Sequence, residues 1–293
     1  MRHIETVMWT GTVRSLSLQD QLKVSKGVGC RALSISPHLY TKWLSDGLST
    51  REMRNMAEDS GVRIFHLDPY ARWMRQWRAN NLDQRKYPIG FRGFAEDDFF
   101  RIGEALGVES VSAIVSCDAA QVSWDELYEG FARTCDRAAD AGMRVDLEFI
   151  PFWGLPDLAS AWNVLKTVGR PNSGLVFDCW HYFRGRPDDA LLSSIPGERI
   201  SSVQLADAEL EVVHGDNLVD DCLSFRRPPG DGNFPLAALL RLLYAIGGLN
   251  RVGPEIFSAA LDGRGSDEIA SVCRSSLGAL FHAAHIDNPF ATD

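Results

Sequence analysis

The chain has 293 residues, of which 45% are hydrophobic and 24% charged, so it has enough apolar material for a large core. Its formal net charge of −9 argues against a nucleic-acid partner, because binding a phosphate backbone calls for a basic surface. No apolar run approaches the roughly 20 residues that span a bilayer, which argues against a membrane protein. The six cysteines are scattered without a CxxC motif, so we expect reduced thiols rather than disulfides or zinc ligands.

The N-terminal residues, Met1-Arg2-His3-Ile4-Glu5, lead directly into a strand-like run and carry no signal-peptide pattern. We therefore expect a cytoplasmic protein that acts on a small molecule, without a nucleic-acid or membrane partner. A homo-oligomer is compatible with this sequence.

Strand-like and helix-like segments alternate along the whole chain. The expected strands are Ile4–Trp9, Arg31–Ile35, Val62–Leu67, Ser110–Val115, Arg144–Phe149, Ser173–Asp178, Ile200–Leu205 and Arg251–Ile256. The expected helices are Ser17–Lys26, Thr50–Ser60, Glu96–Leu106, Trp124–Ala141, Pro156–Val168, Pro187–Leu192, Phe234–Ile246 and Ser266–Ala284. Eight strands in strict alternation with helices favour a closed barrel over an open doubly wound sheet.

This reading gives a single (β/α)₈ domain over residues 1–293. The doubly wound alternative needs a glycine-rich phosphate turn after the first strand, and Gly11-Thr12-Val13-Arg14 is no such motif. Two long loops interrupt the alternation of strands and helices: Asp68–Gly93 and Ala206–Asn233. The first contains Trp73 and Trp77 among several arginines and is predicted to be a lid over the site.

Four side chains with metal-binding oxygens stand where four successive predicted strands end: Glu148, Asp178, Gln204 and Glu255. The carboxyl ends of parallel barrel strands converge on one face, so these side chains could surround one divalent cation. Oxygen ligands favour Mn²⁺, with Mg²⁺ or Co²⁺ as alternatives, over Zn²⁺. A buried, paired carboxylate is the simpler interpretation of any one of them, whereas four matching positions favour a metal site.

Further polar and aromatic residues are predicted near the same rim. His181 follows Asp178 by three residues and is expected to contact substrate or support a ligand. Arg227 lies on a loop rich in proline and glycine and could bind substrate oxygens, although a solvated loop charge is the alternative. Trp9 and His66, at the ends of strands one and three, are also candidate substrate contacts, although packing under a loop is as good an explanation for such aromatics.

Several segments together resemble the sugar-phosphate isomerase/epimerase family of xylose-isomerase-like TIM barrels. The resemblance rests on Leu147-Glu148-Phe149, Phe177-Asp178-Cys179-Trp180-His181, Val203-Gln204-Leu205-Ala206-Asp207, Pro229-Gly230-Asp231-Gly232 and Pro254-Glu255. It implies that Glu148 and Glu255 bind the metal and also move the proton. It gives Asp178 and Gln204 ligand roles, and His181 and Arg227 contacts to substrate oxygens.

The chemistry implied by this resemblance is proton abstraction next to a carbonyl, through an enediolate stabilised by the metal. Proton return gives isomerisation or epimerisation of a keto-sugar, whereas loss of a β-oxygen from the same intermediate gives a lyase. Gln204 stands where the family's 3-epimerases usually have histidine and looks more like some 3-dehydroshikimate dehydratases of the superfamily. An endonuclease of this superfamily and a non-catalytic barrel are weaker alternatives, because histidines are few and all four oxygen ligands are present.

Overall fold

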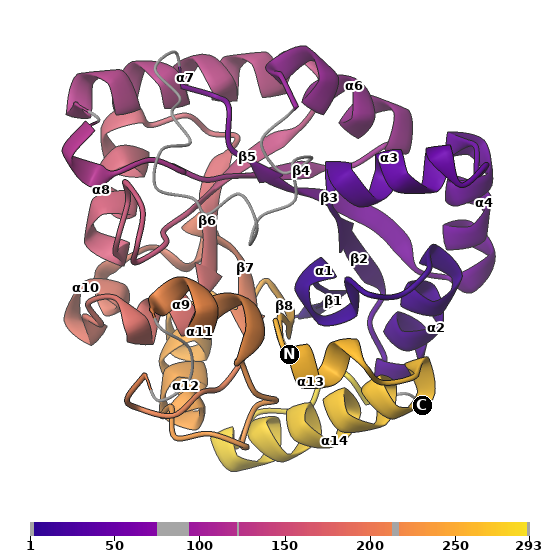
Figure 1. The fold of residues 1–293 in the computed structure, drawn as a ribbon. Helices are drawn as coiled ribbons and strands as arrows, with labels where there is room; N and C mark the ends of the chain where they lie inside the picture. The colour runs from indigo at the N-terminus through magenta and orange to yellow at the C-terminus, as the bar shows by residue number, and fades with distance from the viewer. Residues whose placement is uncertain (1–2, 75–93, 122, 213–216, 292–293) are drawn as a thin grey trace.

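Eight parallel strands close into one barrel, in which each strand pairs with the next in sequence and β8 pairs with β1 (Figure 1). In the computed structural model, residues 3–74, 94–121, 123–212 and 217–291 are described. The strands are β1 (Glu5–Met8), β2 (Ala32–Ile35), β3 (Arg63–Tyr70), β4 (Ser110–Ala113), β5 (Arg144–Glu148), β6 (Ser173–Asp178), β7 (Ile200–Leu205) and β8 (Arg251–Pro254). The predicted (β/α)₈ fold is therefore confirmed.

Helices surround the barrel on its outer side (Figure 1). The larger ones are α2 (Leu18–Val28), α3 (Pro37–Ser45), α4 (Thr50–Ser60), α6 (Glu96–Leu106), α7 (Trp124–Asp140), α8 (Leu158–Val168), α12 (Leu236–Ile246) and α14 (Ser266–Ala284). Shorter ones are α1 (Thr10–Val13), α9 (Cys179–Arg184), α10 (Asp189–Ser194), α11 (Leu218–Ser224) and α13 (Ala259–Asp262). Helices α1, α3, α9, α11 and α13 lie in segments that the sequence pattern left as loops.

Helix α7 illustrates how local sequence sets these helices. It begins after Ser123, whose side chain accepts from the Glu126 backbone N–H while the Glu126 carboxylate accepts from the Ser123 N–H. This capping box satisfies two backbone donors that a helix start leaves free. Its buried residues, Leu127, Gly130, Phe131, Thr134, Cys135 and Ala138, recur at helical spacing and so form one face. That face packs toward β5.

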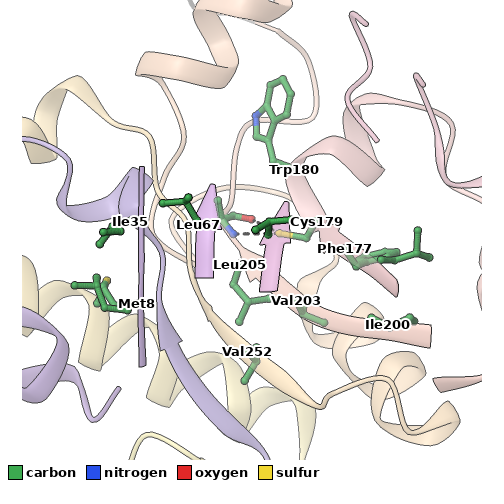
Figure 2. Packing of buried hydrophobic residues seen from close by; sticks show 14 of the residues in the cluster. Met8, Ile35, Leu67, Phe177, Cys179, Trp180, Ile200, Val203, Leu205 and Val252 are labelled. Atoms are coloured by element: carbon green, nitrogen blue, oxygen red, sulfur yellow. Dashed lines mark hydrogen bonds between the residues drawn. The ribbon is translucent and has the colours of Figure 1, made fainter. Parts of the chain in front are cut away.

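The main core lies between the barrel and the helices. Outward-facing strand residues such as Met8, Ile35, Leu67, Val203 and Val252 are fully buried there (Figure 2). Alternate residues of each strand point the other way, into the barrel. The functional side chains predicted at the strand ends therefore share the inner face, which is the reason why they can meet.

The N-terminal end of the barrel interior is filled by ion pairs. Arg63 and Arg251 both bind the Glu5 carboxylate, which is partly buried. Next to them Arg144 donates to the Ser201 hydroxyl at 3.1 Å, and that hydroxyl donates to Asp146 at 2.6 Å. A small apolar layer of Val7, Trp9, Ala32 and Phe65 follows. The barrel interior is thus closed at its N-terminal end and polar at its C-terminal mouth.

The segment expected to form a lid is only partly described. Strand β3 extends to Tyr70, beyond the predicted end at Leu67, and residues 75–93 lie outside the described part of the chain. Trp73 is buried against Phe131, and its indole N–H donates to the Ile114 carbonyl at 2.7 Å. Trp73 therefore packs in the core.

Among the described residues, no helix has the length and apolar character needed to cross a bilayer.

Candidate metal centre

The four predicted oxygen ligands all lie at the C-terminal ends of strands. Glu148 and Asp178 are the last residues of β5 and β6, Gln204 is the penultimate residue of β7, and Glu255 follows β8 directly. Asp178 and Gln204 are paired neighbours across β6 and β7. All four are buried, with exposed fractions of 5% or less. The strand register therefore brings them to one mouth of the barrel, as the sequence predicted.

Asp178 is the most constrained of the four. Its Oδ1 accepts from the backbone N–H groups of Trp180 at 2.6 Å and His181 at 3.1 Å, which caps the start of α9. Its Oδ2 accepts from the Arg226 guanidinium at 2.6 Å. The two oxygens have different partners, so the carboxylate plane is fixed before any ligand binds.

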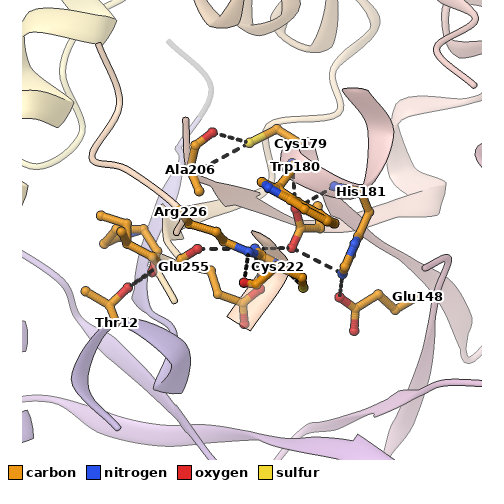
Figure 3. Close-up of polar contacts among 12 residues, drawn as sticks. Thr12, Glu148, Cys179, Trp180, His181, Ala206, Cys222, Arg226 and Glu255 are labelled. Carbon is orange, nitrogen blue, oxygen red and sulfur yellow. Dashed lines mark hydrogen bonds and ion pairs between the residues drawn. The ribbon is translucent and has the colours of Figure 1, made fainter. Parts of the chain in front are cut away.

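His181 lies between two of the carboxylates. Its Nε2 is 3.4 Å from Glu148 Oε1 and 3.6 Å from Asp178 Oδ2 (Figure 3). One ligand atom from each of Glu148, Asp178 and His181 lies within 4.8 Å of the others, a separation that suits a shared metal ion. Burial lowers the pKa of His181 to about 3, so the imidazole is neutral and keeps a lone pair. His181 could therefore act as a ligand as well as a substrate contact.

Arg226, and not its neighbour Arg227, reaches this cluster. The Arg226 side chain is buried, donates to Asp178, and lies 3.4 Å from Glu255 Oε2 (Figure 3). Arg227 instead forms an ion pair with Glu209 at 2.7 Å, and its side chain is 34% exposed. The two arginines differ because Arg227 forms an antiparallel bridge with Asp207, and adjacent residues of an extended segment point in opposite directions.

The carboxyl groups are unevenly ionised because they share one buried space. Burial, followed by the charge of Asp178, raises the pKa of Glu148 to about 8. Burial also raises the pKa of Glu255, although Arg226 opposes the shift. For Asp178, burial disfavours the charged form, but Arg226 and His181 hold its pKa below the usual value. A bound cation would reduce the repulsion between carboxylates that lie this close together.

A divalent metal fits these residues. Both amide atoms of Gln204, Oε1 and Nε2, are buried without a hydrogen-bond partner. An amide left in this way normally costs about 1–3 kcal/mol, so a native site usually supplies a partner for it. A metal ion at the mouth would satisfy the Gln204 oxygen and offset the repulsion between Glu148, Asp178 and Glu255.

Trp9 and His66 lie inside the barrel, with ring centroids 5.3 Å apart. Both are fully buried, and His66 Nδ1 is 2.6 Å from the Ser110 hydroxyl. The Trp9 indole nitrogen and His66 Nε2 have no partner. These two residues therefore present unsatisfied polar atoms, but neither lines the cavity at the mouth.

A cavity of about 80 Å³ opens above the carboxylates. Its polar lining is Asp68, Glu148, His181, Arg226 and Glu255, with Cys222 beside them, and its apolar lining is Pro69, Ile114, Ile150, Phe152, Trp153, Leu223 and Phe257. Sequence reasoning gave no role to Asp68 or Arg226. Asp68 could have been found from its place two residues after His66, on the same face of β3.

The chain is similar to known proteins both in sequence and in fold. The family described as xylose isomerase-like TIM barrel matches residues 22–275. A 3-dehydroshikimate dehydratase of Pseudomonas aeruginosa is 26% identical over 265 residues, which cover 88% of this chain and 38% of the relative. An inosose isomerase of Bacillus velezensis is 27% identical over 226 residues, which cover 73% of this chain and 75% of the relative.

Among solved structures, the IOLI protein with a bound zinc atom has a TM-score of 0.76 at 18% identity, covering 96% of this chain and 98% of that one. This likeness bears on the fold alone. The chain spans 38% of the length of the two dehydratase relatives that it matches.

Proposed function

Because the chain belongs to the xylose isomerase-like TIM barrel family, we propose that it is a divalent-metal-dependent isomerase or epimerase of a small keto-sugar or related polyhydroxy ketone. The observation that carries the proposal is the buried group of Glu148, Asp178, Gln204 and Glu255 at one mouth of the barrel, with the unpartnered Gln204 amide among them. The inosose isomerase relatives support the reaction class.

Glu148, Asp178, Gln204 and Glu255 would hold the metal, with His181 as a further donor. We propose Mn²⁺, with Mg²⁺ or Co²⁺ as alternatives, because most of these ligands are oxygens. When bound, the metal polarises the substrate carbonyl and so makes the neighbouring C–H more acidic.

The protein's own residues would move the proton. Glu148 ends β5 and Glu255 follows β8, two strands that lie on different sides of the barrel. A carboxylate that binds a metal through one oxygen can still use its other oxygen to take a proton from a substrate C–H or to return one. Glu148 would take the α-proton, and Glu255 would return a proton to the opposite face of the carbon. Arg226 would hold Asp178 and Glu255 in place, and His181 would donate to or accept from a substrate oxygen.

A lyase is the second candidate. Two dehydratase relatives match 88% of this chain. The family resemblance also implies that Gln204 stands where the 3-epimerases usually have histidine. In that reaction one carboxylate would remove the α-proton, and the neutral His181 would relay a proton to the leaving β-oxygen, taking up one proton as it gives another away. The same residues would serve both reactions until the enolate has formed. The two reactions differ only in what happens to the enolate next.

The test is incubation of the Mn²⁺-loaded protein with a panel of ketoses, an inosose, 3-keto-glycosides and 3-dehydroshikimate, followed by NMR in D₂O. Deuterium at the α-carbon with an unchanged or isomeric skeleton supports the isomerase or epimerase. A new alkene, an aromatic product or a released aglycone supports the lyase. Absence of metal-dependent exchange or product with every member of the panel would overturn both.

A further inference from the structure

Asp68 is a fourth carboxyl group at the mouth of the barrel, beside the three carboxylates among the proposed ligands. It belongs to β3 and lines the same cavity as Glu148, His181, Arg226 and Glu255. The residue is partly buried, and its Oδ1 is fully buried without a hydrogen-bond partner. A buried carboxyl oxygen left without a partner in a cavity is suited to bind a ligand hydroxyl.

Ser112 connects Asp68 with the proposed base. The Ser112 hydroxyl donates to Glu148 Oε2 at 3.1 Å and also interacts with the Asp68 side chain. Burial and then the charge of Glu148 raise the pKa of Asp68 well above its usual value, although Ser112 opposes this shift. Ser112 lies on β4, between the strands of the two acids. Asp68 is therefore held at a fixed position beside Glu148, with its other oxygen left for a ligand.

The charge balance of the cavity disfavours an anionic substrate. Among the described residues, Arg226 is the one cationic side chain in the cavity lining, and its guanidinium already binds Asp178 and approaches Glu255. Four carboxyl groups, Asp68, Glu148, Asp178 and Glu255, would share that arginine and one divalent metal. A substrate carboxylate would add a fifth acidic group with no free cation to pair with among the described lining residues.

We propose that Asp68 is a specificity-determining residue that binds a hydroxyl of a neutral, polyhydroxylated ketone and excludes substrates that carry a carboxylate. The apolar wall across the cavity, which includes Ile114, Ile150 and Trp153, would cover the C–H face of such a ring. This inference rests on the proposed function, because it assumes that the substrate binds beside the metal ligands.

The experiment compares binding of an inosose, which is neutral, with binding of 3-dehydroshikimate, which carries a carboxylate. Dissociation constants are measured by calorimetry on Mn²⁺-loaded protein in a Glu255→Gln background that stops turnover. Asp68→Asn and Asp68→Ser are introduced into this background, and Asp118→Asn, at an exposed position after β4, is the matched control. Metal content and circular dichroism verify that each variant is folded and loaded.

We expect the parent protein to bind the inosose at least tenfold more tightly than 3-dehydroshikimate. Each Asp68 variant should bind the inosose about 10- to 100-fold more weakly, as for loss of a hydrogen bond to a charged group, and should bind 3-dehydroshikimate more tightly. Asp118→Asn should change neither constant.

A parent protein that prefers 3-dehydroshikimate would overturn the inference, as would Asp68 variants that shift both ligands equally. Metal-dependent α-proton exchange of a ketone in the D₂O panel, with binding unaffected by Asp68, would leave the proposed function standing and reject the inference. If neither ligand binds and no exchange occurs with any ketone, both fail.

Discussion

At the scale of single residues, Glu148 and Glu255 should separate metal binding from proton transfer. Glu148→Gln and Glu255→Gln each keep an oxygen ligand but remove the basic group. Loss of a general base typically costs about 10²–10⁴ in rate, so each variant should retain metal and lose most turnover and most α-proton exchange. Glu58→Gln, at an exposed position of α4, is the control. Normal exchange in Glu255→Gln alone would reject the two-base scheme and favour a one-base lyase with His181 as the acid.

Arg226 and Arg227 are adjacent in sequence but should differ strongly when replaced by glutamine. Removal of the Arg226 guanidinium leaves Asp178 and Glu255 buried without their partner, which should cost about 3–5 kcal/mol of the free energy of unfolding of the metal-free protein. The Arg227 pair with Glu209 is one-third exposed and should be worth less than about 1 kcal/mol. Urea unfolding measures both. Equal effects of the two substitutions would contradict the placement of Arg226 at the site.

His66 should make the protein less stable in acid. Burial, together with Arg251, lowers its pKa to about 3 in the folded protein, whereas an unfolded histidine has a pKa of about 6.5. Below pH 6.5 the unfolded chain binds a proton at His66 that the folded protein does not. The stabilising contribution of the neutral His66 is therefore fully present above the unfolded pKa and is lost as the pH falls. The free energy of unfolding should fall by about 1.4 kcal/mol per pH unit from this residue, down to about pH 3.

The check is urea unfolding of the wild type and of His66→Gln at pH 6.0 and pH 5.0. Over this interval the free energy of unfolding of the variant should fall less than that of the wild type. The difference should be about 1.4 kcal/mol per pH unit, which corresponds to one bound proton. An identical slope in both proteins would show that His66 is protonated in the folded state.

At the scale of elements, β6 depends on a glycine inside the barrel. A Cβ on Gly174 would lie 1.9 Å from Ser201 Oγ and 2.9 Å from Asp146 Oδ1, where the buried polar layer at the N-terminal end is packed. Gly174→Ala should therefore cost about 1–3 kcal/mol of the free energy of unfolding. Gly263→Ala, where no atom lies within 4 Å and φ is −88°, should be neutral or slightly stabilising. Equal effects of both changes on the unfolding midpoint would contradict this packing.

The sequence predicted the barrel and the placement of the four candidate oxygen ligands at its strand ends, because both follow from local pattern. Apolar runs mark parallel strands, and polar residues where those runs stop must share one mouth. Helix α3 was missed although Ser36 caps it and Pro37 occupies its first turn, a signal that was present in the sequence. The choice between Arg226 and Arg227 could not be made in this way, because it depends on the bridge between Asp207 and Arg227, which joins segments 20 positions apart.

The environment of Asp68 could not be predicted from the sequence for a similar reason. Its environment is made by Ser112 and Glu148, which lie on other strands and approach Asp68 only once the barrel has closed. The placement of residues 75–93 over the mouth remains a prediction, since these residues lie outside the described part of the chain.

At the scale of the whole molecule, the barrel brings the ends of four strands, distant in sequence, to one mouth. The proposed chemistry depends on the proposal that these four segments bind one metal ion there. The most direct measurement is a crystal structure of the Mn²⁺-soaked protein, with the ion located by its anomalous scattering. We expect one ion at the mouth of the barrel, with oxygens of Glu148, Asp178, Gln204 and Glu255 at about 2.0–2.3 Å. An ion bound elsewhere, or ligand oxygens more than about 4 Å from a common centre, would contradict the account.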